Sequence, residues 1–289
     1  MSMPTFYVYY DENYPSSWIG EKSSKKIVEY FTSKHEFKVV NARELRDVMS
    51  NAPRHFNEVV ILFSQDIIPD TVVDNPKTPT ENSLIKRFLN QSHTIVWIGD
   101  LPLFYVGLSN REKVSTGEGY RLFYPGLPNP FEAPDNPIIR SQNINITYHG
   151  SLLGLTRRWD SWRPAPQNWS PAVPPLQRPV TYHLAQYYTG SGYRSISHII
   201  DYSGSGLRGF IRLYDCKLPD ISEELIEQLS RVIFYRNPTG IMRILAGMEV
   251  ELKKLREELE TGLKVTKDDT SRIENYIKEA LNILRKKQE

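Results

Sequence analysis

The sequence predicts an α/β fold with a doubly wound, mainly parallel sheet and helices on both faces. Its clearest indication is the uninterrupted apolar run at 59–63, because a strand that is covered on both faces loses the alternation of a half-exposed strand. A second apolar run covers 94–98. Between the two runs, four apolar residues recur at helical spacing: Leu84, Ile85, Phe88 and Leu89. A right-handed crossover then places both strands in one parallel sheet.

Two strand–helix pairs are predicted before this unit. The aromatic and β-branched run at 5–10 predicts the first strand, and a helix follows at about 20–34. A second strand is expected at 37–40, with a short helix at 43–49. Four strands alternating with helices indicate an open α/β sheet.

The middle of the chain has a different composition. Between 125 and 179 lie 11 of the 20 prolines, together with Trp159, Trp162 and Trp169. Proline lacks a donor and fixes φ, so continuous helix or central strand is excluded there. Because this stretch is rich in aromatic residues, we interpret about 107–192 as an ordered, irregular insertion packed over the sheet rather than a linker. A short strand is expected inside it at 143–148.

Regular structure is predicted to return with strands at 193–202 and 209–214, joined by a Gly- and Ser-rich loop. Asp220 and Glu223 have the spacing of a capping box and predict the start of a helix that ends before Pro238. The α/β domain, with its insertion, is therefore expected to span 1–238.

The remaining residues, 239–289, predict a helical hairpin with two short coiled-coil seams. Their apolar residues are Ile241, Leu245, Met248, Leu252, Leu255, Leu259, then Ile273, Ile277, Leu281 and Leu284. This tail has two possible roles. It folds back on its own domain, or it forms a homodimer through 241–284.

The composition limits the classes of partner and site that this chain can have. The net charge is +2 with acidic and basic residues interspersed, which gives no electrostatic argument for a nucleic-acid or membrane partner. The lone cysteine, Cys216, excludes an intramolecular disulfide and a multi-cysteine metal site. There is no apolar stretch of bilayer-spanning length and no signal-peptide pattern at the start. A cytoplasmic protein is the expectation.

Polar residues follow the predicted parallel strands. Asp11, Asn41, Asp66 and Asp100 close them, and ligands of open α/β sheets bind outside the carboxyl ends of the strands. Three carboxylates at one edge could hold Mg²⁺. The commoner reason for such residues is that they cap the following helix, and we expect no metal or cofactor. His149, near the insertion, completes the set of candidate ligand-binding residues.

The sequence contains no catalytic motif that indicates a specific reaction. The spacing from Gly204 to Gly209 matches a dinucleotide fingerprint, but it leads into a strand instead of a helix, so we interpret it as a loop. No Gly-x-Ser-x-Gly or Gly-x-Cys-x-Gly elbow is present. Cys216 therefore indicates a buried structural thiol.

Several segments carry a resemblance to a known fold: VVILFSQDIIPD…SLIKRFLNQSHTIVWIGD, and later HIIDYSGSGLRGFIRLYD with ISEELIEQLSRVIFY. Together they resemble the class I glutamine amidotransferase-like fold, particularly its ThuA-like and trimerisation-domain members. The resemblance covers 5–106 and 193–236. Active amidotransferases have a nucleophilic cysteine in the turn after the strand that corresponds to 94–98. This chain has Gly99-Asp100-Leu101-Pro102 instead. The resemblance therefore implies a member without glutaminase chemistry, and no catalytic residue is carried over.

Two functions are consistent with these features. We favour a non-catalytic protein that binds a ligand or partner at the strand ends and assembles through its tail. The alternative is a hydrolase of a small polar substrate that uses Asp11, Asp66 and Asp100, either with a divalent metal or as acid–base groups. The alternative requires at least two of these carboxylates to converge in a pocket.

Overall fold

The computed structural model describes residues 4–52, 58–124, 138–166, 180–188, 190, 192–202 and 207–235. The predicted hairpin at 239–289 and the predicted dimer interface within it lie outside these residues, as does most of the Pro-rich part of the insertion.

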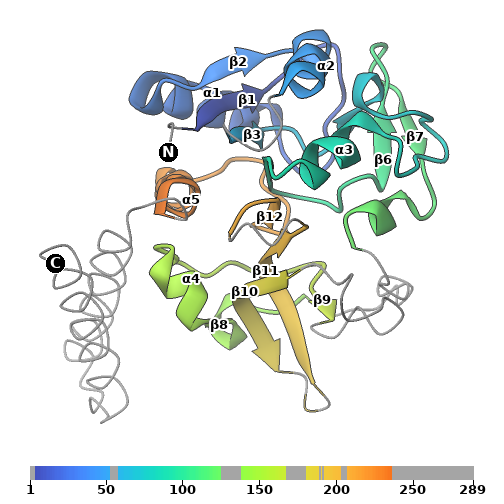
Figure 1. Cartoon of the computed structure of the whole chain (residues 1–289). Coiled ribbons are helices and arrows are strands. Elements are labelled where there is room, and N and C mark those ends of the chain that lie inside the picture. The colour runs from blue at the N-terminus through green and yellow to red at the C-terminus, as the bar shows by residue number, and fades with distance from the viewer. Residues whose placement is uncertain are drawn as a thin grey trace, which may run out of the picture.

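A nine-stranded mixed sheet forms the centre of the described chain, in the order β2-β1-β3-β5-β12-β11-β10-β8, with β9 paired to β11 (Figure 1). One half is parallel and contains β1 (Thr5–Tyr9), β2 (Lys38–Val40), β3 (Val59–Phe63), β5 (Thr94–Trp97) and β12 (Phe210–Arg212). The other half is antiparallel and contains β8 (Asn145–Ile146), β9 (Ala165–Pro166), β10 (Val180–Tyr188) and β11 (Tyr193–Asp201).

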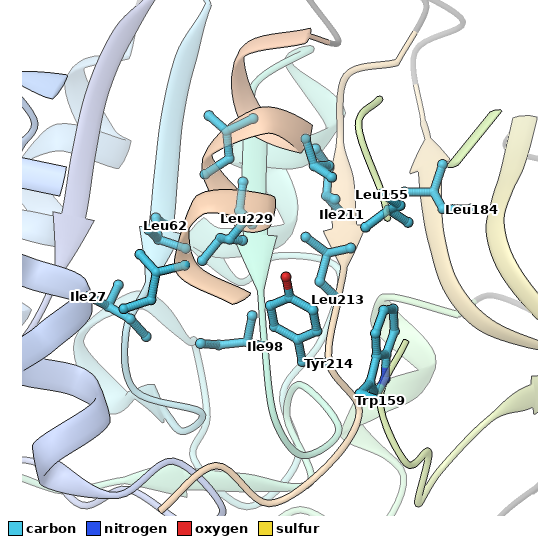
Figure 2. Close-up of a cluster of buried hydrophobic side chains, with 14 of the residues drawn as sticks. Ile27, Leu62, Ile98, Leu155, Trp159, Leu184, Ile211, Leu213, Tyr214 and Leu229 are labelled. Atoms are coloured by element: carbon cyan, nitrogen blue, oxygen red, sulfur yellow. The ribbon is translucent and has the colours of Figure 1, made fainter. Parts of the chain in front are cut away.

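Each face of the parallel half has its own hydrophobic cluster. On one face, Ile27 and Phe31 of α1 (Glu21–His35) and Leu229 of α5 (Glu223–Tyr235) join the cluster that contains Leu62 and Ile211. Figure 2 shows Leu229 of α5 between Leu62 of β3 and Ile211 of β12. On the other face, α2 (Ala42–Asn51) and α3 (Leu84–Asn90) join the cluster of Tyr9, Ile61, Phe63 and Trp97. The central strand β3 is buried along its whole length, as its uninterrupted apolar run predicted.

The described chain also contains smaller elements. A second sheet, in the order β4-β6-β7, consists of β4 (Ile68–Pro69), β6 (Tyr105–Gly107) and β7 (Lys113–Ser115). The remaining elements are 3₁₀ helices η1 (Asp70–Val72), η2 (Gly119–Leu122) and η3 (Ser141–Asn143), and the short helix α4 (Tyr148–Leu152). Among the described helices, none has the length and apolar character needed to cross a membrane.

The general α/β class is confirmed, but the prediction of a mainly parallel sheet missed that β8, β9, β10 and β11 form an antiparallel half of it. Three of them, β8, β9 and β10, lie within 107–192, so this region extends the sheet and is not solely an irregular cover. The predicted strand at 143–148 is present as β8.

The predicted start of α5 was wrong by two residues, because an N-cap at Asp220 would begin the helix at Ile221. The helix begins at Glu223. Asp220 instead forms ion pairs with Lys22 and Lys26 of α1, at 2.5 Å each, so its carboxylate connects the segment before α5 to α1 rather than capping a helix.

Candidate ligand site at the strand ends

The order of the strands creates a crevice at the carboxyl ends of β1 and β3. The chain passes from β1 outward to β2 and then returns to β3 on the other side of β1, which is the geometry that opens a crevice for ligands in α/β sheets. A pocket of about 280 Å³ lies there, between the β1–α1 loop and the β6–β7 hairpin. It is lined by Tyr10, Glu12, Tyr14, Pro15, Ser16, Glu21, Ser24, Gln65, Arg111 and Lys113.

Asp66 fixes the β1–α1 loop beside this pocket. Its Oδ1 accepts hydrogen bonds from Ser16 Oγ and Ser17 N, both at 2.8 Å, and its Oδ2 accepts one from Trp18 N, also at 2.8 Å. The carboxylate also accepts the backbone N–H of Asp100 at 3.1 Å, and it is only 2% exposed. Backbone N–H groups before a helix N-terminus commonly bind an anion. Here the anion is a side chain of the protein itself.

Asp11 and Asn41 cap local structure. Asp11 Oδ2 accepts the N–H of Ala42, the first residue of α2, at 3.0 Å, and its Oδ1 accepts the N–H of Asn13 at 2.9 Å. The Asn41 side chain and Glu44 form a capping box at the start of α2. Both side chains therefore stabilise the connection from a strand to the helix that follows.

Asp100 belongs to a neighbouring cluster. Its Oδ1 lies 3.2 Å from Nη1 of Arg163, which directly precedes β9 in the chain. The Arg163 guanidinium also lies over the rings of Trp18, at 5.1 Å, and Phe104, at 4.7 Å. Burial raises the pKa of Asp100, and Arg163 opposes this effect.

Asp66 and Asp100 are thus brought together, whereas Asp11 is engaged by α2. His149 is separate from all three: it lies on α4, which packs against β10 near the other edge of the sheet, and its ring is 5.4 Å from that of Tyr182. Within the described ranges, no three His, Cys, Asp or Glu side chains are grouped so that they could hold a metal ion.

The floor and the rim of the pocket have different chemistry. The floor is fixed: Gln65 accepts the N–H of Asp11 at 2.8 Å and donates to the carbonyls of Asp11 and Tyr14, and Ser24 Oγ donates to the Ser64 carbonyl. The rim carries the cations Arg111 and Lys113. Arg111 is anchored by the hydrogen bond from its Nε to the Glu12 carbonyl at 2.8 Å.

Two tyrosines form the remaining wall. Burial raises the pKa of Tyr10. Burial, followed by the hydrogen bond from Tyr14 Oη to Asp70, also raises the pKa of Tyr14. Both rings therefore carry neutral phenols at physiological pH.

Sequence reasoning missed the pocket residues Arg111 and Lys113 because it did not predict the β6–β7 hairpin. The signal was present. Asn110 and Arg111 form the turn, in which Asn110 Oδ1 accepts the N–H of Glu112 and the Arg111 N–H bonds the Leu108 carbonyl. On either side lie the short β-prone runs at 105–107 and 113–115.

The model of one protein family matches residues 5–237, which include all the described strands and the pocket. The chain belongs to the MJECL34 family. One relative is described as an uncharacterised protein, MJECL34 of Methanocaldococcus jannaschii. It is 31% identical to this MJECL34-family chain over 288 residues. The alignment covers 96% of this chain and 90% of the relative. The alignment thus extends past the family match into the tail. No solved structure matches the chain.

Proposed function

We propose that this MJECL34-family chain is a non-catalytic protein that binds a small ligand at the carboxyl ends of β1 and β3. The observation that carries the proposal is the pocket of about 280 Å³ at the point where the strand order reverses. Its floor is already held by hydrogen bonds of the protein, so the site is preformed, while its rim offers charged and aromatic groups to a ligand.

The charges of the rim favour an anionic ligand. Arg111 and Lys113 line the pocket together with Glu12 and Glu21. Lys25 lies 2.6 Å from Glu21 and 3.9 Å from Glu12, so it offsets part of the acidic charge. The two tyrosine walls suit a flat ring. A small metabolite with an anionic group and a planar ring, such as a nucleoside monophosphate, fits this chemistry.

The engagement of the strand-end carboxylates supports a non-catalytic role over the hydrolase alternative. Asp66 is held by the β1–α1 loop and Asp11 by the start of α2. A carboxylate acting as base or metal ligand needs lone pairs directed at the reacting groups. Cys216 is 5% exposed, and burial raises the pKa of its thiol, which is the reverse of what a nucleophile needs.

We further propose that the domain is a doubly wound, amidotransferase-like fold that lacks glutaminase chemistry, and that 241–284 mediate homodimerisation. The order of the five parallel strands and the turn at Gly99 after β5, without a cysteine, support the first part. The heptad spacing of apolar residues supports the second.

The ligand class is tested by isothermal titration calorimetry of the full chain with AMP, adenosine and inorganic phosphate. AMP is expected to bind at least about tenfold more tightly than either fragment, because only AMP offers both ring and anion. The double variant Arg111→Gln/Lys113→Gln is expected to lose most of this affinity. The matched control, Arg43→Gln on the exposed side of α2, should bind AMP like the wild type. Equal affinity of the wild type and the double variant would exclude the pocket as the site.

A further inference from the structure

The turn between β6 and β7 has an arginine where a hairpin of this type favours glycine. The Leu108 N–H donates to the Glu112 carbonyl, and the Arg111 N–H donates to the Leu108 carbonyl, each at 3.0 Å. These two hydrogen bonds close a three-residue loop, 109–111, whose last residue is left-handed and is favourably glycine. Arg111 occupies that position with a φ of +64°. Because its Cβ crowds the backbone, this conformation strains arginine but not glycine.

The other left-handed residues with a Cβ have a structural reason for this conformation. Among the described residues they are Glu36, Ser92, Leu103, Leu207 and Tyr214. The first two lie just after helices α1 and α3, where a left-handed residue is common. The other three have side chains that pack in the hydrophobic clusters. Arg111 is exposed and lies between two strands, so neither reason applies, and its strain points to a use of the side chain.

The Arg111 side chain reaches from the hairpin to the β1–α1 loop and lines the pocket. Its Nε donates to the Glu12 carbonyl at 2.8 Å. Within the described part of the chain, its side chain makes no other hydrogen bond or ion pair. Its charge acts on the pocket wall, because burial raises the pKa of Tyr10 and Arg111 is one of the cations that oppose this rise. The terminal nitrogens Nη1 and Nη2 are therefore left to bind an oxyanion through two parallel hydrogen bonds.

The hairpin that carries Arg111 is fixed at its base. A Cβ at Gly107 of β6 would lie 2.9 Å from Pro15 Cδ and 3.0 Å from Ile67 Cγ2. Strand β6 thus packs directly against the β1–α1 loop, at a residue that also lines the pocket. Because the base of the hairpin is held in this way, the position of the turn relative to the pocket is set by the fold, which is what a preformed contact to a ligand requires.

Lys113 is a cation of a different kind. Its Nζ lies 5.3 Å from the centre of the Tyr105 ring, so the neighbouring strand already interacts with the ammonium. Lysine also lacks the planar fork of arginine and acts as a point charge. Lys113 therefore adds positive potential at the pocket without a fixed geometry, and salt screens such a contribution.

We propose that Arg111 is the residue that selects for the ligand's phosphate group, which it binds end-on through Nη1 and Nη2. The left-handed turn holds the guanidinium in place, and Lys113 contributes only attraction at a distance. This proposal rests on the function proposed for the β1–β3 pocket and specifies which side chain recognises the anion. A nucleoside without the phosphate gains nothing from Arg111.

The test is isothermal titration calorimetry of two single variants of the full chain with AMP and with adenosine. Arg111→Gly should weaken AMP binding at least about tenfold at low salt and at about 0.5 M salt, and should leave adenosine binding unchanged. Lys113→Gln should weaken AMP binding less than about threefold, and this loss should vanish at the higher salt. Equal losses in the two variants would overturn the proposal, because only net charge would then matter. A parallel loss of adenosine binding in Arg111→Gly would also overturn it, by showing a structural role.

A second measurement needs no ligand. Arg111→Gly and Arg111→Ala both lose the guanidinium and its hydrogen bond to Glu12, but only glycine releases the strain. The glycine variant should therefore unfold at a Tm about 2–4 °C above that of the alanine variant. The matched pair Arg46→Gly and Arg46→Ala, on the exposed side of α2, should show the opposite order, because glycine destabilises a helix. A glycine variant of Arg111 that is no more stable than the alanine variant would contradict the strained turn.

The outcomes separate this proposal from the one on which it rests. A wild type that does not bind AMP would overturn both. AMP binding of equal strength by the wild type and Arg111→Gly would overturn only the role of Arg111 and would leave the pocket as the proposed site.

Discussion

The Asp66 carboxylate, which follows β3, accepts the backbone N–H of Trp18 in the β1–α1 loop at 2.8 Å. The same carboxylate bonds Ser16, Ser17 and Asp100. One buried side chain thus joins the ends of three neighbouring strands, β1, β3 and β5, and shapes the wall of the proposed pocket.

Asp66→Asn is therefore expected to lower the free energy of unfolding by about 2–3 kcal/mol, because an amide cannot accept all of these hydrogen bonds and lacks the charge that strengthens them. Asp47→Asn, on the exposed face of α2, is the control and should change stability by less than about 0.5 kcal/mol. Urea unfolding followed by circular dichroism measures both. Similar values for the two variants would show that Asp66 does not organise the loop.

Gly99, in the turn after β5, is expected to be far more sensitive than Gly117. Both have positive φ, +86° and +66°. A Cβ at Gly99 would lie 2.8 Å from Asp66 Cβ, whereas a Cβ at Gly117 would meet nothing within 4 Å. Both alanine variants lose about 1 kcal/mol to backbone strain. Gly99→Ala should lose about 1–3 kcal/mol more through overpacking. Equal losses in urea unfolding would mean that the turn can move away from Asp66.

His183 is expected to make stability depend on pH. Burial, and then His149, lowers its pKa to about 4, below the value of about 6.5 in the unfolded chain. The unfolded state therefore binds the proton first, so stability is complete above about pH 6.5 and falls as the pH decreases toward 4.

The His183→Gln variant should remove this part of the pH dependence. Between about pH 7 and pH 5, the free energy of unfolding of the wild type should fall by about 1 kcal/mol more than that of the variant, after allowance for solvent screening. Comparing the two proteins cancels the contributions of carboxylates such as Asp100. Parallel curves for the two proteins would show that His183 protonates in the folded state as it does in the unfolded chain.

Cys216 should resist alkylation in the folded protein. Its burial and its raised pKa keep the thiol protonated and covered, so iodoacetamide at about pH 8 should modify it only after unfolding. Intact-mass measurements with and without denaturant check this. Rapid modification of the folded chain would indicate an activated thiol and would contradict the non-catalytic proposal.

Charged residues in the first seam should dissociate the proposed dimer. In the full chain, Leu245→Lys with Leu252→Lys places cations at heptad core positions and is expected to halve the mass measured by light scattering. Lys253→Gln, outside the seam, is the control. An unchanged mass in the double variant would exclude dimerisation through this segment.

The apolar runs at 59–63 and 94–98 were sufficient to predict the buried parallel strands, because a strand that is buried on both faces consists of consecutive apolar residues. The antiparallel half of the sheet was harder. β10 pairs with the next strand, β11, but it follows a stretch dense in proline. The sequence alone does not reveal that β8 and β9 add to the same sheet, since their partners are distant in the chain.

The strand-end residues were located correctly, but their neighbours were not predicted. Asp66 and Asp100 meet because β3 and β5 are adjacent; the sequence predicted that both strands belong to one parallel sheet, but not that they are neighbours. Arg163, Arg111 and Lys113 reach the strand ends from segments whose paths depend on tertiary packing. The burial of Arg212 was not predicted, because an isolated arginine in an apolar strand has no local signature of its environment.

The most direct test of ligand binding at the β1–β3 pocket is native mass spectrometry of the freshly purified full chain, beside the Arg111→Gln/Lys113→Gln variant. The account predicts a small anionic molecule retained by the wild type, or taken up from added AMP, and absent from the variant. A wild type that stays bare when AMP is added, or a variant that carries the same mass as the wild type, would contradict it.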